Sequence, residues 1–211
     1  SEGKVNYGDE IAVPADPSKD GYTFSGWNPE VPETMPAEDM TFVATWTANK
    51  YTISFDTDGG SDVASITQDY GSEIIAPANP TKEGHTFKGW NPALPATMPA
   101  ENMTVKAVWE INVYTVTFDS DGKTNDVEVE YGKTVAKPAD PEKEGYTFVA
   151  WYLDGKEYDF SAPVTKDITL VAKFTVNGYN VKFVVDGETV SEGKVNYGDE
   201  SHGVHVDLPD R

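Results

Sequence analysis

GYTFSGW at residues 21–27, GHTFKGW at 84–90 and GYTFVAW at 145–151 are three copies of one seven-residue stretch. From each copy to the next the chain advances 63 and then 61 residues. Self-similarity at a nearly fixed period of this size is the sequence signature of a repeat architecture. Although 211 residues would ordinarily suggest one or two domains, we expect an array of one small unit and a function typical of arrays.

Two further short motifs recur in the same order around this stretch. A run led by tyrosine begins at Tyr51, Tyr114 and Tyr179, passes through Asp-Gly and is followed by a Tyr-Gly pair. A Pro-rich link, the seven-residue stretch and a closing run complete the unit. This order predicts a partial repeat without its first strand at 1–47, complete repeats at 48–110 and 111–176, the first hairpin of a further repeat at 177–200, and a non-native tail at 201–211.

Both ends of the chain carry the same ten residues. SEGKVNYGDE stands at 1–10 and again at 191–200, which predicts a parent array with a 190-residue super-period, divided in the middle of a unit. After Glu200 the expected continuation IAVPADP is replaced by SHGVHVDLPDR. A vector-derived tail and a divergent natural terminus both explain that change.

Alternation of apolar and polar residues predicts strands in every unit. Tyr51, Ile53 and Phe55 alternate with polar residues, as do the runs that begin at Tyr114 and Tyr179. Asp-Gly pairs at 58–59, 121–122 and 186–187 supply the positive φ that a tight hairpin requires. Paired prolines before each seven-residue stretch limit any helix to about one turn. We therefore expect a mainly β fold, α+β at most.

Aromatic residues are the expected core, because a unit of about 60 residues needs the large apolar area that they bury. Alternation within the seven-residue stretch places Phe24 and Trp27 on opposite sides, and the glycine before the tryptophan predicts a β-bulge or a close backbone approach. A platform of rings that stacks on sugars is the alternative. The predicted core consists of Phe24, Trp27, Trp46, Phe55, Tyr70, Phe87, Trp90, Trp109, Phe118, Tyr131, Phe148, Trp151 and Phe174.

Charge and composition argue against several classes of function. The chain has 36 acidic and 16 basic residues, a formal net charge of -20, which repels phosphate backbones and anionic headgroups. We therefore expect no nucleic-acid partner. No apolar run approaches the roughly 18 residues of a membrane span, so we also expect no membrane insertion. The absence of cysteine removes disulfides and thiol chemistry.

Few residues suggest catalysis or metal binding. His85 takes the place of Tyr22 and Tyr146, so we expect a substituted core or interface aromatic. No serine has a histidine partner within its unit, and we therefore expect neither catalysis nor a cofactor. The acidic turns could supply some of the roughly six to eight oxygens that calcium requires, although Gly follows the second acid directly, as a hairpin demands. The weak calcium candidates are Asp56, Asp58, Asp62, Asp119, Asp121 and Asp126.

The combined pattern resembles the Listeria-Bacteroides repeats, which are called B-repeats in listerial internalins. The resemblance covers residues 1–200, and the third unit, with Tyr158, Asp159 and Phe160, is the most similar to the internalin form. It implies compact β-grasp-like modules strung in tandem in secreted and surface proteins, chiefly of Gram-positive bacteria, with no catalytic residues. The motifs that carry it are Tyr114 to Gly122, Tyr131-Gly132, Pro141 to Trp151, and Met35-Pro36 or Met98-Pro99.

The leading functional hypothesis is a structural stalk or spacer that holds an adhesive or catalytic domain away from a cell wall. An adhesive module for a host glycan or protein, using exposed aromatics such as Tyr152, and an accessory region of a large extracellular enzyme are the alternatives. The expected location is extracellular, with anchoring signals outside this fragment, and the expected partners are neighbouring repeats.

Self-association is a further hypothesis. The hairpin from Tyr179 to Tyr197 contains the tyrosine-led strand that residues 1–47 lack, so one molecule could complete the next by head-to-tail strand addition.

Overall fold

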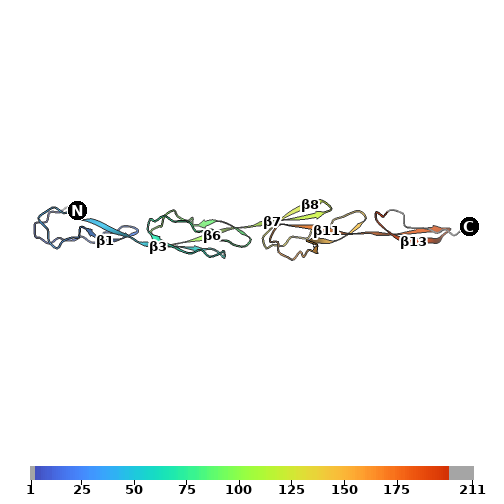
Figure 1. The fold of residues 1–211 in the computed structure, drawn as a ribbon, viewed down its shortest axis with the longest axis horizontal. Coiled ribbons are helices and arrows are strands. Elements are labelled where there is room, and N and C mark those ends of the chain that lie inside the picture. The colour runs from blue at the N-terminus through green and yellow to red at the C-terminus, as the bar shows by residue number, and fades with distance from the viewer. Residues whose placement is uncertain (1–2, 200–211) are drawn as a thin grey trace. The chain divides into compact units, whose positions relative to one another are not determined.

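The computed structural model describes residues 3–199, and within this range it contains strands and no helix. It divides into two compact units between Glu110 and Ile111, each of which holds one complete repeat and one shorter strand pair (Figure 1). The prediction of a mainly β fold is confirmed. A search of the described residues for a helix that could span a membrane finds none.

The second repeat is a four-stranded sheet in the order β4-β3-β6-β5. β3 (Lys50–Asp56) pairs antiparallel with β4 (Ile66–Asp69) and in parallel with β6 (Met103–Ile111), and β5 (His85–Asn91) lies beyond β6. Parallel pairing places Ile53 opposite Met103 and Phe55 opposite Val105. The first and last strands of the repeat are therefore its two central strands, and they run in the same direction.

The third repeat has the same arrangement with one short strand added, in the order β10-β9-β11-β7-β8. Its first and last strands again pair in parallel, with Val116 opposite Ile168 and Phe118 opposite Leu170. Tyr158 and Phe160 pack against the core of this repeat. The strands are β7 (Val113–Ser120), β8 (Lys123–Glu130), β9 (Tyr146–Leu153), β10 (Lys156–Glu157) and β11 (Ile168–Val176).

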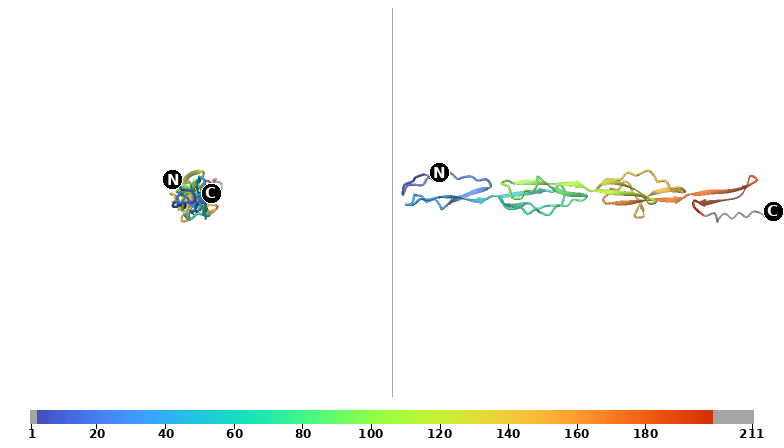
Figure 2. Two further views of the ribbon diagram at one scale, coloured as in Figure 1. Left: turned by 90° about the vertical axis from the view of Figure 1, so that its left-hand side faces the viewer. Right: turned by 90° about the horizontal axis from the view of Figure 1, so that it is seen from above.

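Two shorter segments each contain one antiparallel strand pair. In the first segment, β1 (Tyr22–Asn28) pairs with β2 (Val43–Ala48), which are the counterparts of β5 and β6. In the last segment, β12 (Gly178–Val185) pairs with β13 (Glu188–Asn196), the counterparts of β7 and β8. The right-hand view of Figure 2 shows the strand pairs and the long irregular connections from a further direction.

Two of the three predicted tight hairpins are present. Asp121-Gly122 separates paired residues Ser120 and Lys123, and Asp186-Gly187 separates Val185 and Glu188. Both residues of each turn have positive φ, for example 58° at Asp121 and 83° at Gly122. This combination gives the turn type that matches the twist of the flanking strands.

The prediction of a tight hairpin is wrong in the second repeat. Asp58 and Gly59 have positive φ there too, but β3 ends at Asp56 and β4 begins only at Ile66. The wider loop packs against Trp109, whose indole Nε1 donates a hydrogen bond to the Thr57 carbonyl at 3.0 Å. This contact with the closing strand explains why the loop continues beyond the turn.

The most deeply buried side chains of the complete repeats are not aromatic, and the predicted aromatic residues form only part of the two cores. Ile53, Met98 and Val105 in the second repeat, and Val116, Val164 and Leu170 in the third, are at most 2% exposed. Among the predicted core residues, Phe118 and Trp151 are buried. The single small sheet of each repeat is covered by irregular connections and not by a helix or a second sheet. The other large aromatic rings therefore lie between the core and the surface. The half-buried ones are Phe24, Trp27, Trp46, Phe55, Tyr70, Phe87, Trp90, Trp109, Tyr131, Phe148 and Phe174.

A β-bulge lies within the seven-residue stretch, as predicted. The pairing of β1 with β2 shifts by one residue between Phe24 and Gly26, and Gly26 has φ of 122°. The bulge brings Phe24 and Trp27 together, with ring centroids 5.4 Å apart. Their predicted placement on opposite sides is therefore wrong, because the extra residue interrupts the alternation on which it depended.

We expect Leu170→Ala to destabilise the third repeat by about 2–5 kcal/mol, because it removes buried methyl groups and leaves a cavity. Val171→Ala is the matched control, since Val171 is the next residue of β11 and is 48% exposed. Hydrogen-exchange mass spectrometry of the amides in residues 113–176 measures both effects. Similar exchange in the two variants would contradict the position of Leu170 in the core.

Candidate functional site at the repeat junctions

A single asparagine separates the last strand of the first segment from β3 of the second repeat. The Asn49 N–H donates to the Gly21 carbonyl at 2.9 Å, and the Asn49 carbonyl accepts from the Tyr70 N–H at 2.8 Å. The Thr23 hydroxyl donates to Asn49 Oδ1 at 2.5 Å. Asn49 thus joins the start of β1 to the Tyr-Gly pair of the next repeat, and we call this arrangement a repeat junction.

The same three hydrogen bonds form at the junction between the third repeat and the last segment. The Asn177 N–H donates to the Gly145 carbonyl at 2.8 Å, and the Tyr197 N–H donates to the Asn177 carbonyl at 2.8 Å. The Thr147 hydroxyl donates to Asn177 Oδ1 at 2.6 Å. Because both junctions use residues at equivalent positions, the repeated sequence encodes the junction as well as the repeat.

The glycine that opens the seven-residue stretch lets a tyrosine ring approach the backbone. Gly21 and Gly145 are buried, and they have φ of 76° and 75°. A Cβ atom at Gly21 would overlap the Tyr70 ring, and one at Gly145 would overlap the Tyr197 ring. Glycine is therefore required there both by the positive φ and by the lack of space.

A lysine beside an aromatic ring marks the same end of each repeat. Nζ of Lys19, Lys82 and Lys143 lies 5.7 Å from a ring centroid of the closing strand, in Trp46, Trp109 and Phe174 respectively. Such cation–π contacts stabilise by about 0.5–1 kcal/mol at exposed sites.

In the two complete repeats this lysine also pairs with the aspartate of the Asp-Gly turn. Lys82 Nζ lies 3.8 Å from Asp58 Oδ2 and donates to the Asp58 carbonyl at 2.7 Å, and Lys143 Nζ lies 3.0 Å from Asp121 Oδ1. The lysine, the ring and the aspartate, which we call the turn cluster, connect the first hairpin to the closing strand.

The acidic turns use their carboxylates within the repeats. Lys106 Nζ lies 2.8 Å from Asp58 Oδ1, and this hydrogen bond and charge hold the pKa of Asp58 below its ordinary range. Asp56 accepts the Asp58 N–H at 3.0 Å, Asp119 accepts the Gly122 N–H at 2.8 Å, and Asp126 accepts the Thr117 hydroxyl at 2.7 Å. No group of three or more metal-ligating side chains occurs within residues 3–199, and calcium binding stays a prediction.

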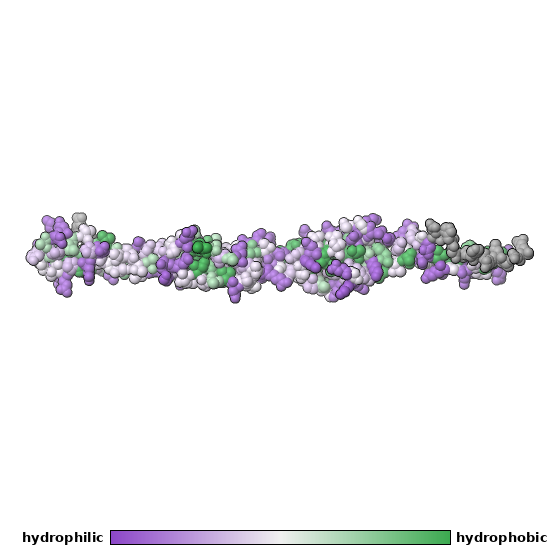
Figure 3. Space-filling view, in the orientation of Figure 1, coloured by the Kyte–Doolittle hydropathy of each residue, from purple (hydrophilic) through white to green (hydrophobic). Residues whose placement is uncertain are grey.

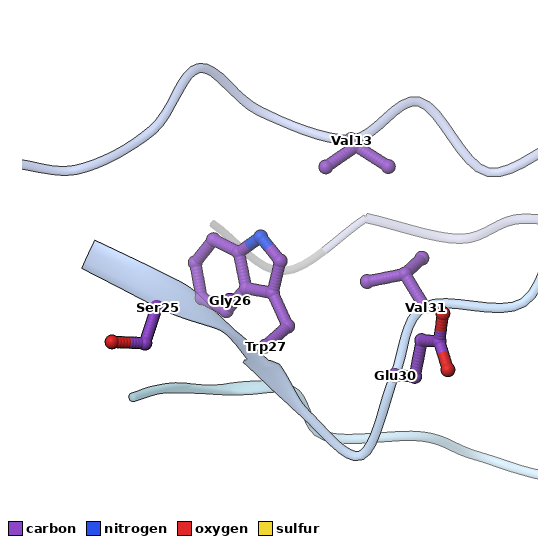
Figure 4. A pocket seen from close by; sticks show the side chains of 6 residues that line it. All are labelled: Val13, Ser25, Gly26, Trp27, Glu30 and Val31. Carbon is purple, nitrogen blue, oxygen red and sulfur yellow. The ribbon is translucent and has the colours of Figure 1, made fainter. Parts of the chain in front are cut away.

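A shallow hollow of about 450 Å³ lies in the first segment. Figure 4 shows the Trp27 indole and the side chains of Val13 and Val31 turned toward this hollow, with Ser25 pointing away. The Trp27 Nε1 atom is buried without a hydrogen-bond partner. Glu30 also lines the hollow.

The junctions and the turn clusters were not predicted from the sequence, although both have a signal in it. Asn-x-Tyr recurs at 49–51, 112–114 and 177–179, and the Pro-x-Lys before each seven-residue stretch contains the lysine. His85, predicted to be a core or interface aromatic, is half-buried, and its Nδ1 lies 2.8 Å from the Glu83 carbonyl. The predicted tail at 201–211 lies outside the described residues.

We expect Gly145→Ala to open the last junction while Gly155→Ala leaves it intact. Both positions have positive φ, 75° and 79°, so both alanines carry a backbone cost of roughly 1–2 kcal/mol. Only the Cβ at 145 overlaps the Tyr197 ring; an added Cβ at 155 has no neighbour within 4 Å. Faster exchange of the Tyr197 amide in Gly145→Ala alone is the expected result, and equal exchange in both variants would refute the close-contact argument.

We expect Lys106→Met to raise the pKa of Asp58 toward the ordinary value of an aspartate. Because the pKa of Asp58 is lowered in the folded chain, its contribution to stability is present above about pH 4 and is lost as the pH falls through the lowered pKa. Carboxyl NMR titration measures the change. Lys88→Met is the control, since Lys88 pairs with Glu110 at 2.9 Å, and an unchanged Asp58 pKa in Lys106→Met would contradict the assignment.

The chain is similar in sequence to parts of several known proteins. The chain is 36% identical over 209 residues to a protein of Evansella cellulosilytica named provisionally as a Gly-rich membrane protein, covering 89% of this chain and 24% of the relative. It is 42% identical over 174 residues to a second provisionally named membrane protein of that organism, covering 75% and 26%. Internalin H of Listeria monocytogenes is 40% identical over 141 residues, covering 60% and 25%.

The chain spans about a quarter of the length of these relatives. The sequence model of the Listeria-Bacteroides repeat domain matches residues 1–45, 51–108 and 114–173, which together make up most of the chain. These matches coincide with the first segment and the two complete repeats, and they show that the chain belongs to the Listeria-Bacteroides repeat family.

Proposed function

We propose that this chain is a structural stalk or spacer of a bacterial surface or secreted protein, which holds an adhesive or catalytic domain away from the cell. The observation that carries the proposal is the parallel pairing of the first and last strands in each complete repeat. The chain therefore enters and leaves a repeat in the same direction. An array built in this way gains length with every repeat added.

The gain per repeat follows from the register. Lys50 lies three residues before Ile53, and Ile111 lies eight residues after Met103, the partner of Ile53. The second repeat thus advances the chain by about 11 strand residues, or roughly 36 Å at about 3.3 Å per residue. A closely wound globular repeat of the same length would advance it much less.

The junctions support the same proposal because they restrict bending. One asparagine separates consecutive repeats, and in the two described junctions its backbone N–H, its backbone carbonyl and its side chain all form hydrogen bonds. A flexible linker would leave these groups to water. On the face that Figure 3 shows, every described repeat carries hydrophilic residues, and a surface of this kind favours solubility.

We infer from the named relatives that the parent protein is exposed at the cell surface or secreted, since one is an internalin and two are named as membrane proteins. The repeats themselves carry no catalytic function in this proposal. Adhesion is the rival interpretation, but Tyr152, its suggested aromatic, is half-buried, and Lys173 Nζ lies 4.8 Å from its ring centroid. Binding of this chain on broad glycan arrays would favour adhesion.

We expect small-angle scattering from dilute protein to give a radius of gyration at least twice the roughly 17 Å of a compact chain of this length. A variant with a Gly/Ser linker inserted between Asn49 and Lys50 is the control. It has a longer sequence but should scatter as a more flexible particle, because the insertion separates the groups that the first junction joins. A compact profile for the unmodified chain would refute the spacer.

A further inference from the structure

The chain enters and leaves each complete repeat on two neighbouring strands. In the third repeat it enters along β7 and leaves along β11, and four residues of each strand pair in parallel. In the second repeat it enters along β3 and leaves along β6, which also pair at four residues. A pull on the chain at both sides of a repeat therefore acts first on this pair of strands.

Parallel pairing directs such a pull along the strands. The load enters at the start of one strand and leaves at the end of the other, and in a parallel pair these two points lie at opposite ends. The strands are then drawn past each other, and all four residue pairs resist together. If the first and last strands were antiparallel, the two points would lie at the same end, and the residue pairs would separate one after another.

A side chain extends the parallel pair by one hydrogen bond in both complete repeats. Asp167 Oδ1 accepts the Thr115 N–H at 2.8 Å, and Asn102 Oδ1 accepts the Thr52 N–H at 2.7 Å. In each repeat the donor and the acceptor stand directly before the first residues of the parallel pair. Two different amino acids thus supply the same bond at equivalent positions, which indicates that the bond belongs to the design of the repeat.

Water has little access to the parallel pair of the third repeat. All four β7 residues of the pair also pair with β8 on the other edge of β7. On the core side Val116 and Leu170 are completely buried, and Phe118 is 3% exposed. An opened hydrogen bond costs less free energy where water can replace the lost partner. Burial therefore makes the pair harder to open under load.

The irregular parts of a repeat lie outside the path of the load. In the third repeat they are mainly residues 131–145, between β8 and β9, and residues 158–167, before β11. Both stretches fall between the two paired strands in the chain. While the pair holds, the load passes directly from β7 to β11, and these connections carry no tension.

We propose that the parallel strand pair of each complete repeat is a mechanical clamp, and that the chain bears tension as well as providing length. The proposal rests on the spacer function for its purpose, since a pull on a domain carried by the array passes through every repeat. The clamp itself is a property of one repeat. Weak resistance to force would overturn the clamp and leave the spacer intact, whereas a compact scattering profile would do the reverse.

Single-molecule force spectroscopy on the whole chain tests the clamp, with introduced cysteines as attachment points because the natural chain has none. Val113→Cys with Val176→Cys attaches the handles at opposite ends of the pair, at two exposed side chains. Val113→Cys with Lys166→Cys is the matched control, since both handles then lie at the same end.

The first attachment should require at least about twofold more force than the control, because it loads the residue pairs together and the control loads them in turn. Equal forces, or a larger force in the control, would overturn the clamp.

The length released tests the path of the load. With handles at residues 113 and 176 we expect a single step of about 190 Å, because about 64 residues at roughly 3.6 Å each replace a folded length of roughly 36 Å. Several smaller steps would overturn the proposal, since they would mean that the irregular connections yield before the strands separate.

Substitution of Asp167 tests the added hydrogen bond. Asp167→Ala should lower the force by roughly a fifth if the contacts along the pair share the load equally. Asp167→Asn should retain the force, since Asn102 occupies this position in the second repeat. Asp140→Ala is the matched control, because it also removes a 2.8 Å contact, to Lys137, but in the connection between β8 and β9. Equal losses from the two alanine variants, or no loss from either, would place the load elsewhere and overturn the proposal.

Discussion

The parallel pairing of first and last strands is the interaction on which each repeat depends. Ile53 and Val105 lie on the paired strands of the second repeat, Val116 and Leu170 lie on those of the third, and all four are completely buried. One contact therefore closes the core and also sets the direction in which the chain leaves the repeat. Parallel strands must be joined by a connection that crosses the sheet. The pairing that folds the repeat therefore also lets the next repeat follow in the same chain direction.

The repeated stretch GKVN demonstrates how far a partner decides local structure. At residues 193–196 it lies within β13, paired with β12, whereas at residues 3–6 the same four residues form no strand. The four residues are the same at the two places, so the difference in secondary structure comes from the presence of β12 beside residues 193–196. Strand propensity is weak compared with pairing and packing, and half of a repeat accordingly cannot form its whole share of the sheet.

Most of the strands could be predicted because their apolar residues alternate, and the bulge could be predicted from its glycine. The composition of the core could be predicted only in part: Phe118 and Trp151 are buried as expected, whereas Ile53 is buried at the centre of the second repeat and Trp90 is half-buried there. The junctions were missed because they depend mainly on backbone groups, which have no side-chain pattern. Asn49 was visible in the sequence, but its hydrogen bonds to Gly21 and Tyr70 join positions that only the fold brings together.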